Sequence, residues 1–149
     1  MRFGFCVVRR NASGQVDPAF GSGGTANVNF GHDWLGLGSE AIAYDNAGNI
    51  VVAGRLVPKY PLRHATFGVA RFNSSGSLDR RFGVRGRRVF RVKGSDSGAQ
   101  NHITGMRLGP RGRIVVTGAF QPDFSREDGG DAIVASLRAD GSTDRSFAR

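Results

Sequence analysis

The chain has 149 residues, of which 39% are hydrophobic and 23 are glycine, which is enough for one hydrophobic core and too apolar for a disordered polymer. The single cysteine excludes an intrachain disulfide, no zinc-type spacing of cysteine and histidine occurs, and no stretch approaches the about 20 apolar residues of a membrane helix. The net charge of +9 favours acidic partners, but the basic residues are spread over every segment, so we do not expect nucleic acid as the main partner.

In chain order, short alternating segments predict β-strands separated by turns rich in glycine and asparagine. Residues 3–10 form the first, and basic residues at its end interrupt it before a signal-peptide core develops, so we expect no export signal. The segment Asp-Pro-Ala-Phe that follows predicts a single turn capped by Asp17 and anchored by Phe20. Further strands are predicted at residues 25–30, 40–44, 50–56, 67–73, 87–92, 103–108, 113–120 and 132–138. Continuous apolar runs at 50–53 and 114–116 predict strands covered on both faces.

These elements recur. Residues 67–83 match residues 5–21 at an offset of 62 and residues 132–148 at an offset of 65, and residues 40–54 match residues 104–118 at an offset of 64. For the recurrent aspartates we favour a capping role over catalysis or metal binding, and for the glycines a role in turns and close packing. The predicted structural positions are Gly14, Asp17, Phe20, Gly48, Gly54, Gly76, Asp79, Phe82, Gly112, Gly118, Gly141, Asp144 and Phe147.

Four short antiparallel strands in a period of about 60 residues are typical of a β-propeller blade. We therefore predict an all-β fold with two four-stranded antiparallel blades and a leading strand, as a partial or open propeller. The predicted units are residues 1–24 as the end of a preceding repeat, 25–86 as blade one, and 87–149 as blade two and the start of a third repeat. A blade cannot bury its apolar faces alone, and closed propellers have about 4 to 8 blades. We therefore expect neighbouring blades or self-association to complete the array.

The motifs GVARFN and GSLDRRFG at residues 68–73 and 76–83, with GNIVVAG at 48–54, resemble the delta-60 repeat, a β-propeller-like family of bacterial proteins. The similarity covers two full periods and part of a third. Arg10, Ser136 and Ala148 depart from the usual aromatic, arginine and glycine, which suggests that the terminal copies are degenerate or face a different neighbour. The resemblance implies a propeller fold and occurrence in exported proteins with many repeats, and it carries over no catalytic residue or cofactor.

Loops that differ between the copies are where a repeat protein keeps its binding specificity. These loops are expected at residues 31–39, 57–66, 94–101 and 121–130, with an unknown protein or carbohydrate as ligand. The candidate ligand-binding residues are His32, Asp33, Trp34, His64, Asp96, His102, Asp123 and Asp128. Our first hypothesis is a non-catalytic repeat module with a structural or binding role.

A hydrolase or lyase built on a propeller is the alternative from another class, and it requires His32, Asp33, Asp96 and His102 to converge in one cleft. Ser97 lies in GSDSG and not in a nucleophile motif, and the acidic residues near the end of the chain lack the spacing of a calcium loop. We therefore assign no catalytic and no metal-binding residue.

The second alternative is polyanion binding by the arginine-rich segment at residues 85–93. Arg87, Arg91 and Lys93 share one face of this predicted strand. The competing structural interpretation, which we favour, is an edge strand whose charges discourage pairing with other sheets.

Overall fold

The computed structural model describes residues 4–31, 34–58, 64–96, 100–121 and 131–147, and the fold is all-β, as predicted. Within these ranges, no helix has the length and apolar character needed to cross a membrane. Each predicted strand is present. The elements are β1 (Gly4–Val8), β2 (Thr25–Asn29), β3 (Trp34–Tyr44), β4 (Ile50–Pro58), β5 (His64–Phe72), β6 (Arg87–Asp96), β7 (Gln100–Leu108), the short 3-10 turn η1 (Pro110–Gly112), β8 (Ile114–Gln121) and β9 (Asp131–Leu137).

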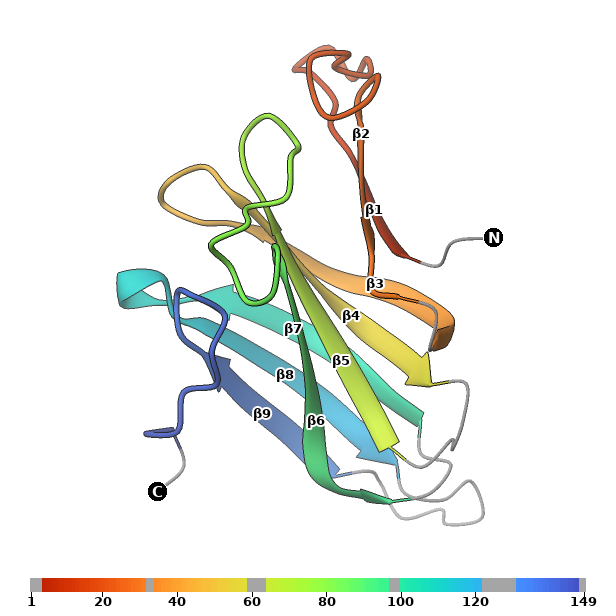
Figure 1. The fold of residues 1–149 in the computed structure, drawn as a ribbon, viewed down its shortest axis with the longest axis vertical. Coiled ribbons are helices and arrows are strands. Elements are labelled where there is room, and N and C mark those ends of the chain that lie inside the picture. Colours follow the sequence, from red (N-terminus) through yellow and green to blue (C-terminus); the bar gives the residue numbers. More distant parts are fainter. Residues whose placement is uncertain (1–3, 32–33, 59–63, 97–99, 122–130, 148–149) are drawn as a thin grey trace.

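The strands form three antiparallel sheets with the orders β1-β2, β3-β4-β5-β6 and β7-β8-β9 (Figure 1). This pairing corrects the predicted blade boundaries by one strand, because β2 pairs with β1 and β6 pairs with β5. The complete four-stranded blade therefore spans residues 34–96 and not 25–86. The tight aspartate turn causes the shift, since it returns the chain to the sheet that it has just left. The amide of Arg9 donates to the carbonyl of Gly24 and that of Arg71 to Gly86, both at 3.0 Å.

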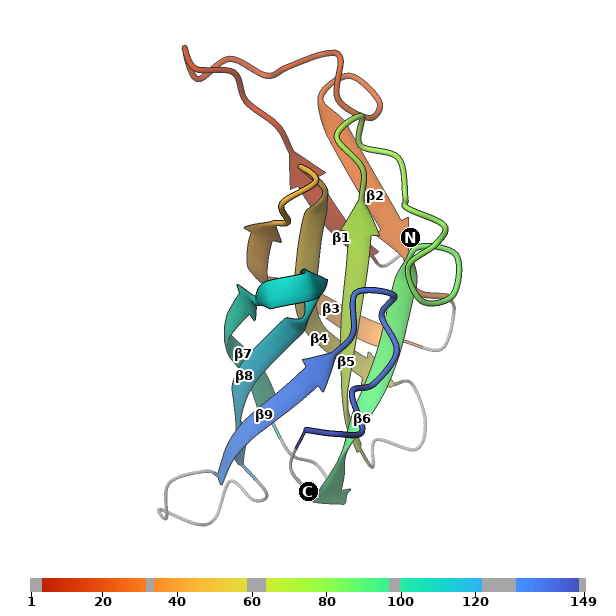
Figure 2. The same cartoon turned by 90° about the vertical axis from the view of Figure 1, so that its left-hand side faces the viewer.

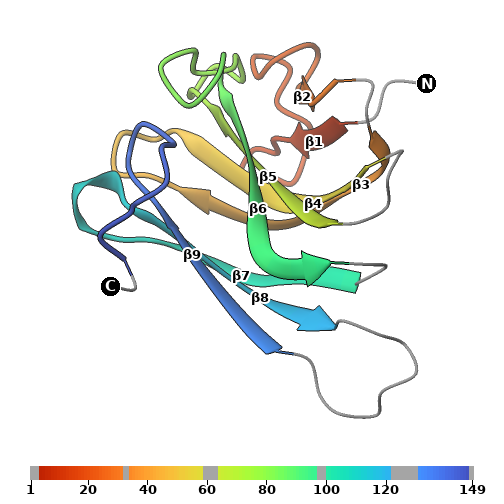
Figure 3. The same ribbon diagram turned by 60° about the horizontal axis from the view of Figure 1, so that its bottom comes forward.

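The three sheets stack face to face, with the four-stranded sheet in the middle (Figure 3). One core cluster lies between β1-β2 and the middle sheet, and the other lies between the middle sheet and β7-β9. β4 supplies both clusters, with Ile50 and Val52 in the first and Val51 and Ala53 in the second. It is covered on both faces, as predicted.

β8 differs from this prediction. Ile114 and Val116 are buried in the second cluster, but Val115 on the other face of β8 is only half-buried, and Val134 on the neighbouring β9 is 51% exposed. No further sheet among the described residues covers this outer face. Continuous apolar character therefore predicted a central strand correctly, but did not predict which of its faces has a neighbour in this chain.

The tight turns of the three sheets gather at one end of the molecule, which we call the turn end (Figures 1 and 2). At the opposite end, the loop end, lie Pro58, His64, Asp96, Gln100, Gln121 and Asp131, the strand termini that flank the predicted binding loops. These loops are shorter than predicted, because β3 already begins at Trp34, β6 continues to Asp96 and β7 begins at Gln100. The start of β3 contains glycine, so its composition did not predict a strand. Pairing with β4 nevertheless holds this segment in the sheet.

The first strand of each later sheet contains an irregularity at the same repeat position. The register shifts between Ser39 and Ala41 in β3 and between Ile103 and Gly105 in β7. A Cβ atom at Gly54 would overlap the carbonyl oxygen of Gly38, and the equivalent glycine of β8 faces the same obstacle. The recurrent glycine of the apolar strand is therefore needed for close backbone approach at this β-bulge.

Candidate functional site

Both complete copies of the repeat motif contain an Arg–Asp–Phe cluster, which consists of Arg9, Asp17 and Phe20 in the first copy and Arg71, Asp79 and Phe82 in the second. The Nε of Arg71 donates to Oδ2 of Asp79 at 2.9 Å, and its guanidinium carbon lies 4.9 Å from the centroid of the Phe82 ring. The first copy repeats this geometry at 2.9 and 4.6 Å. Both phenylalanines are fully buried. The cluster thus combines an ion pair, an Asx turn and a cation–π contact.

Each cluster also binds the glycine turn of the following repeat. Arg71 Nη1 donates to the carbonyl of Ala139 at 2.7 Å, and the amide of Gly83 donates to Asp140 at 2.7 Å. The first copy makes the same two bonds to Ser74 and Ser75, at 2.5 and 2.8 Å. We call each of these two regions a repeat junction. They join successive repeats by identical contacts.

The glycine of the docked turn is constrained by this contact. Gly76 has a φ of +84°, and a Cβ atom there would lie 2.6 Å from the amide nitrogen of Gly21. At Gly141 a Cβ atom would lie 2.9 Å from the ring of Phe82. The recurrence of glycine in this turn therefore reflects the junction as well as the turn itself.

The third copy of the motif lacks the arginine. Ser136 occupies its position, and the buried Asp144 instead lies 3.2 Å from Nη2 of Arg113. The hydroxyl of Ser146, at 2.6 Å, lowers the pKa of Asp144, and Arg113 adds to this effect. Phe147, predicted as an anchor, is 38% exposed, because no turn among the described residues covers it as the glycine turns cover Phe20 and Phe82.

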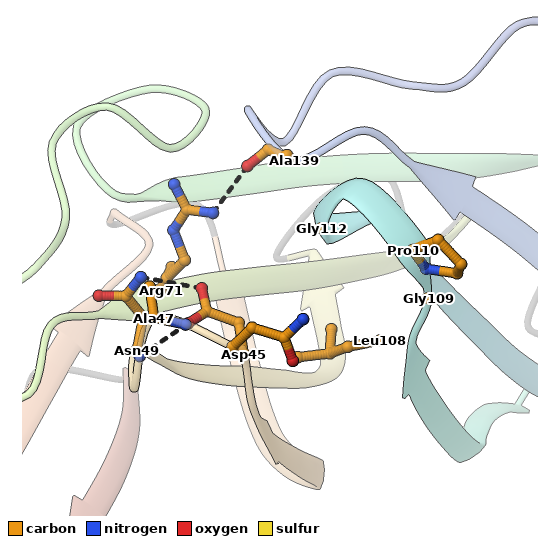
Figure 4. Close-up of a pocket in the computed structure, with 10 residues that line it drawn as sticks. Asp45, Ala47, Asn49, Arg71, Leu108, Gly109, Pro110, Gly112 and Ala139 are labelled. Carbon is orange, nitrogen blue, oxygen red and sulfur yellow. Dashed lines mark hydrogen bonds between the residues drawn. The ribbon is translucent and has the colours of Figure 1, made fainter.

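A cleft of about 540 Å³ lies at the turn end, between the second and third sheets (Figure 4). Asp45 and Arg71 form one side of it, and Pro110 forms part of the other. The carboxylate of Asp45 accepts bonds from the amides of Ala47 and Asn49 at 2.9 and 2.8 Å, and from the Asn49 side chain at 2.8 Å. Partial burial opposes ionisation, but these bonds outweigh it and lower the pKa of Asp45. The carboxylate therefore forms the turn and is not poised as an acid or base.

The predicted ligand-binding residues are distributed over several strands near the loop end. His64 and Asp96 face each other in the register of β5 and β6. Trp34 is buried and donates from Nε1 to the carbonyl of Phe30 at 3.0 Å, so it is a core residue. The positions of His32, Asp33, Asp123 and Asp128 lie outside the described residues. Ser97 and the convergence on which the enzyme alternative depends also lie outside them.

His102 is exposed at the start of β7, and its Nδ1 lies 3.3 Å from Oε1 of Glu40 on β3. The other carboxylate oxygen of Glu40 accepts the amide of Ile103 at 2.8 Å. Sequence analysis did not identify Glu40 as a site residue. The indication in the sequence that could have identified Glu40 is that the equivalent residue of the next copy is Thr104, which does not carry a charge. The β-bulge in β3 occurs at Glu40, whose carboxylate bonds to the neighbouring sheet.

In the part of the chain that the structure describes, no three His, Cys, Asp or Glu residues are grouped so that they could hold a metal ion. The residues predicted to bind polyanions lie on β6, which is the edge strand of its sheet. The guanidinium of Arg87 donates to the carbonyl of Asn29 on β2, so it links two sheets. Arg91 is exposed, and the side chain of Lys93 lies outside the described part.

A second cleft, of about 290 Å³, lies between β1 and β3. It is lined by Cys6 and Val8 from β1 and by Glu40 and Ile42 from β3, and Val8 and Ile42 are 50% and 57% exposed. Among the described residues, β1 has a partner strand on one edge only. Because the amide of Arg9 faces the β2 side, alternation along the strand directs the amides of Cys6 and Val8 to the open edge.

Stacked antiparallel sheets whose strands recur with the sequence period, and which are open rather than closed, define a chain built from β-propeller repeats. Two segments, residues 48–82 and 112–147, match the family model described as a domain of unknown function (DUF5122) beta-propeller. Each segment starts in the turn before β4 or β8 and ends in the aspartate turn, so the match follows the structural repeat and recurs in two successive copies. No curated protein and no solved structure matches the chain.

Proposed function

We propose that this chain is a non-catalytic repeat module with a structural and binding role in a larger propeller array, in agreement with its resemblance to the delta-60 repeat. The observation that carries the proposal is the open edge of β1. β1 and β5 are equivalent strands of successive repeats, and the corresponding edge of β5 is paired with β4 along seven residues, from Ile50 to Leu56. A strand of the same apolar, β-branched type completes the edge of β1.

The position of the cleft between β1 and β3 supports the proposal that a further strand pairs with β1. In the next repeat β4 contacts β7, which is the equivalent of β3. The place of the missing strand is therefore the space between β1 and β3, where Val8 and Ile42 expose apolar surface. An added strand would cover Ile42 and would pair with the amides of Cys6 and Val8. The partner is a neighbouring blade, supplied by a longer array or by a second copy of this chain.

The test is the solution mass of the purified chain by light scattering, with near-ultraviolet circular dichroism on the same sample. We expect a folded oligomer whose mass depends on the open edge. Cys6→Pro removes one edge amide without removing a bond to β2, so it should shift the mass toward the monomer. Cys6→Ala is the matched control and should behave like the unmodified chain. A folded chain that stays monomeric at every concentration, with Val8 and Ile42 accessible, would overturn the proposal.

A further inference from the structure

A third cleft, of about 480 Å³, lies between β6 and the turn that follows β9. It is lined by Arg88 from β6 and by Arg138, Ser142, Thr143 and Arg145 from the last repeat. We call it the arginine cleft. Figure 2 shows this last turn running beside β6 at the outer side of the sheets. Three arginine residues from two different repeats therefore line one opening.

The repeat itself shows that the fold does not require these residues. At the first junction, Ala26 occupies the position of Arg88, and Leu78 occupies the position of Thr143. Ala26 is buried and Leu78 packs against the same core cluster, so an apolar pair closes that junction. At the second junction a charged and a polar residue replace this pair. A role in maintaining the fold does not by itself explain this replacement, because an apolar pair occupies the same two positions at the first junction.

Arg88 has unused hydrogen-bonding capacity in this cleft. Its Nη2 donates to Oγ1 of Thr143 at 3.2 Å, but its Nε is buried and has no hydrogen-bond partner among the described residues. A buried donor without an acceptor is unfavourable. Arg138 and Arg145 are exposed, so their guanidinium groups can turn toward a bound group at little cost. An acceptor placed in the cleft would satisfy the Nε of Arg88 and meet two further cations.

Among the described residues, Asp140 and Asp144 are the carboxylates close in sequence to the lining residues of the cleft, and both already have partners. Asp140 accepts the amide of Ser142 at 2.8 Å. Asp144 accepts two bonds from Ser146 and faces Arg113 at 3.2 Å. Arg138 Nε is 4.0 Å from Asp144, too far for a strong hydrogen bond. With Arg113 included, four guanidinium groups stand against two carboxylates, so the cleft carries a net positive charge.

We propose that the arginine cleft binds a phosphate or sulfate group, because several guanidinium forks converge where an oxygen-rich anion would satisfy the buried Nε of Arg88. Guanidinium groups match the oxygens of such anions with paired, charge-assisted hydrogen bonds. The cleft is larger than one such anion, so it can also hold part of the molecule that carries the group. The site is separate from the face of Arg87 and Arg91, which lies on the other side of β6. It does not depend on the role of the chain in an array.

The experiment titrates the full chain with inorganic phosphate and with sulfate, and follows the Nε–H resonance of Arg88 by NMR and the affinity by calorimetry. We expect this resonance to shift and to saturate. Arg88→Ala combined with Thr143→Leu restores the residue pair of the first junction, so this variant should fold and lose binding. Arg145→Ala, a single change of an exposed side chain, should weaken binding by about tenfold. Arg107→Ala removes an equal charge from the exposed face of β7 and should leave affinity unchanged.

A second arm identifies the source of the anion. Heparin, a sulfated polymer, should bind more tightly than sulfate and lose affinity steeply with salt if the natural group is carried on a polymer. Equal affinities for heparin and sulfate would assign the cleft to a small, free anion, and both results support the site. The proposal is overturned if neither anion shifts the Arg88 resonance, or if the double variant and Arg107→Ala lose affinity equally. The oligomer measurement that tests the array does not affect either outcome.

Discussion

Removing the arginine of the second Arg–Asp–Phe cluster should destabilise the chain more than removing any exposed arginine. In Arg71→Ala, Asp79 loses a charge-assisted bond of about 2 kcal/mol, and the carbonyl of Ala139 loses its donor at about 1 kcal/mol. The cation–π contact with Phe82 adds about 0.5 kcal/mol. The side chains of Arg71 and Asp79 are only 14% and 19% exposed, so solvent screens the pair little. We therefore expect a loss of about 3–3.5 kcal/mol in the free energy of unfolding.

The assay is urea and thermal denaturation of the full chain. A loss of that size corresponds to a fall in Tm of about 6–12 °C for a chain of this length. Arg9→Ala tests the reasoning from burial, because its pair with Asp17 has the same length but both side chains are 28% exposed. Its loss should be smaller, at about 1–2 kcal/mol.

Arg71→Lys keeps the charge, but one ammonium group cannot reproduce the fork that reaches both Asp79 and Ala139. The stability of Arg71→Lys should therefore lie between that of Arg71→Ala and that of the unmodified chain. Arg107→Ala is the control for the loss of an exposed arginine and should stay within about 0.5 kcal/mol of the unmodified chain. Equal stabilities for Arg71→Ala and Arg107→Ala would refute the view that the cluster holds successive repeats together.

Three further outcomes follow from the geometry. Gly76→Ala should destabilise the chain by at least about 2 kcal/mol more than Gly48→Ala, since both have positive φ but only Gly76 lacks space for a Cβ atom; equal Tm values would contradict this. Because the pKa of Asp45 is lowered from 3.8 on folding, it stabilises the fold above that pH and loses this effect as pH falls through its folded-state pKa. Asp45→Asn should therefore flatten the acid side of the stability curve, and an unchanged curve would exclude the effect. Glu40→Ala should lower the hydrogen-exchange protection of the Ile103 amide, whose bond at 2.8 Å it removes, whereas undiminished protection would show that the amide does not depend on Glu40.

The strands could be predicted from the sequence because their signals are local. Period-two alternation and a repeat of about 60 residues locate every strand, and the apolar run at residues 50–53 predicts the doubly covered β4. The assignment of strands to sheets was displaced by one strand, because it depends on whether the chain folds back or moves on after each turn. The Arg9 and Arg71 amide bonds that decide this connect residues on both sides of the aspartate turn. Their pattern is not visible in one strand at a time.

The contacts that join the repeats could not be predicted in the same way. Glu40 and Ile103 are 63 residues apart, and only the stacking of two sheets brings them together. The arginine cleft likewise combines β6 with a turn that begins some 40 residues after the end of β6. Comparison of the copies does indicate the site, because Arg88 and Thr143 occupy positions that are apolar in the first junction. Such departures from the repeat are therefore better markers of specific sites than the repeated residues themselves.

The same logic gives a prediction for Ser136, where the third copy departs from the Arg–Asp–Phe cluster. Ser136 is 3% exposed and its Oγ has no hydrogen-bond partner among the described residues, while Arg113, at 3.2 Å, is the nearer of the two cations that face Asp144. Since the serine hydroxyl is not needed to hold Asp144, its removal should relieve the cost of a buried, unpaired polar group. Ser136→Ala should therefore raise the stability by about 1 kcal/mol, whereas Arg113→Ala should lower it by leaving Asp144 only the more distant cation of Arg138, at 4.0 Å. A destabilised Ser136→Ala variant would mean that this hydroxyl bonds a part of the chain beyond the described residues, and that the third copy is stabilised by a different contact from the one assigned here.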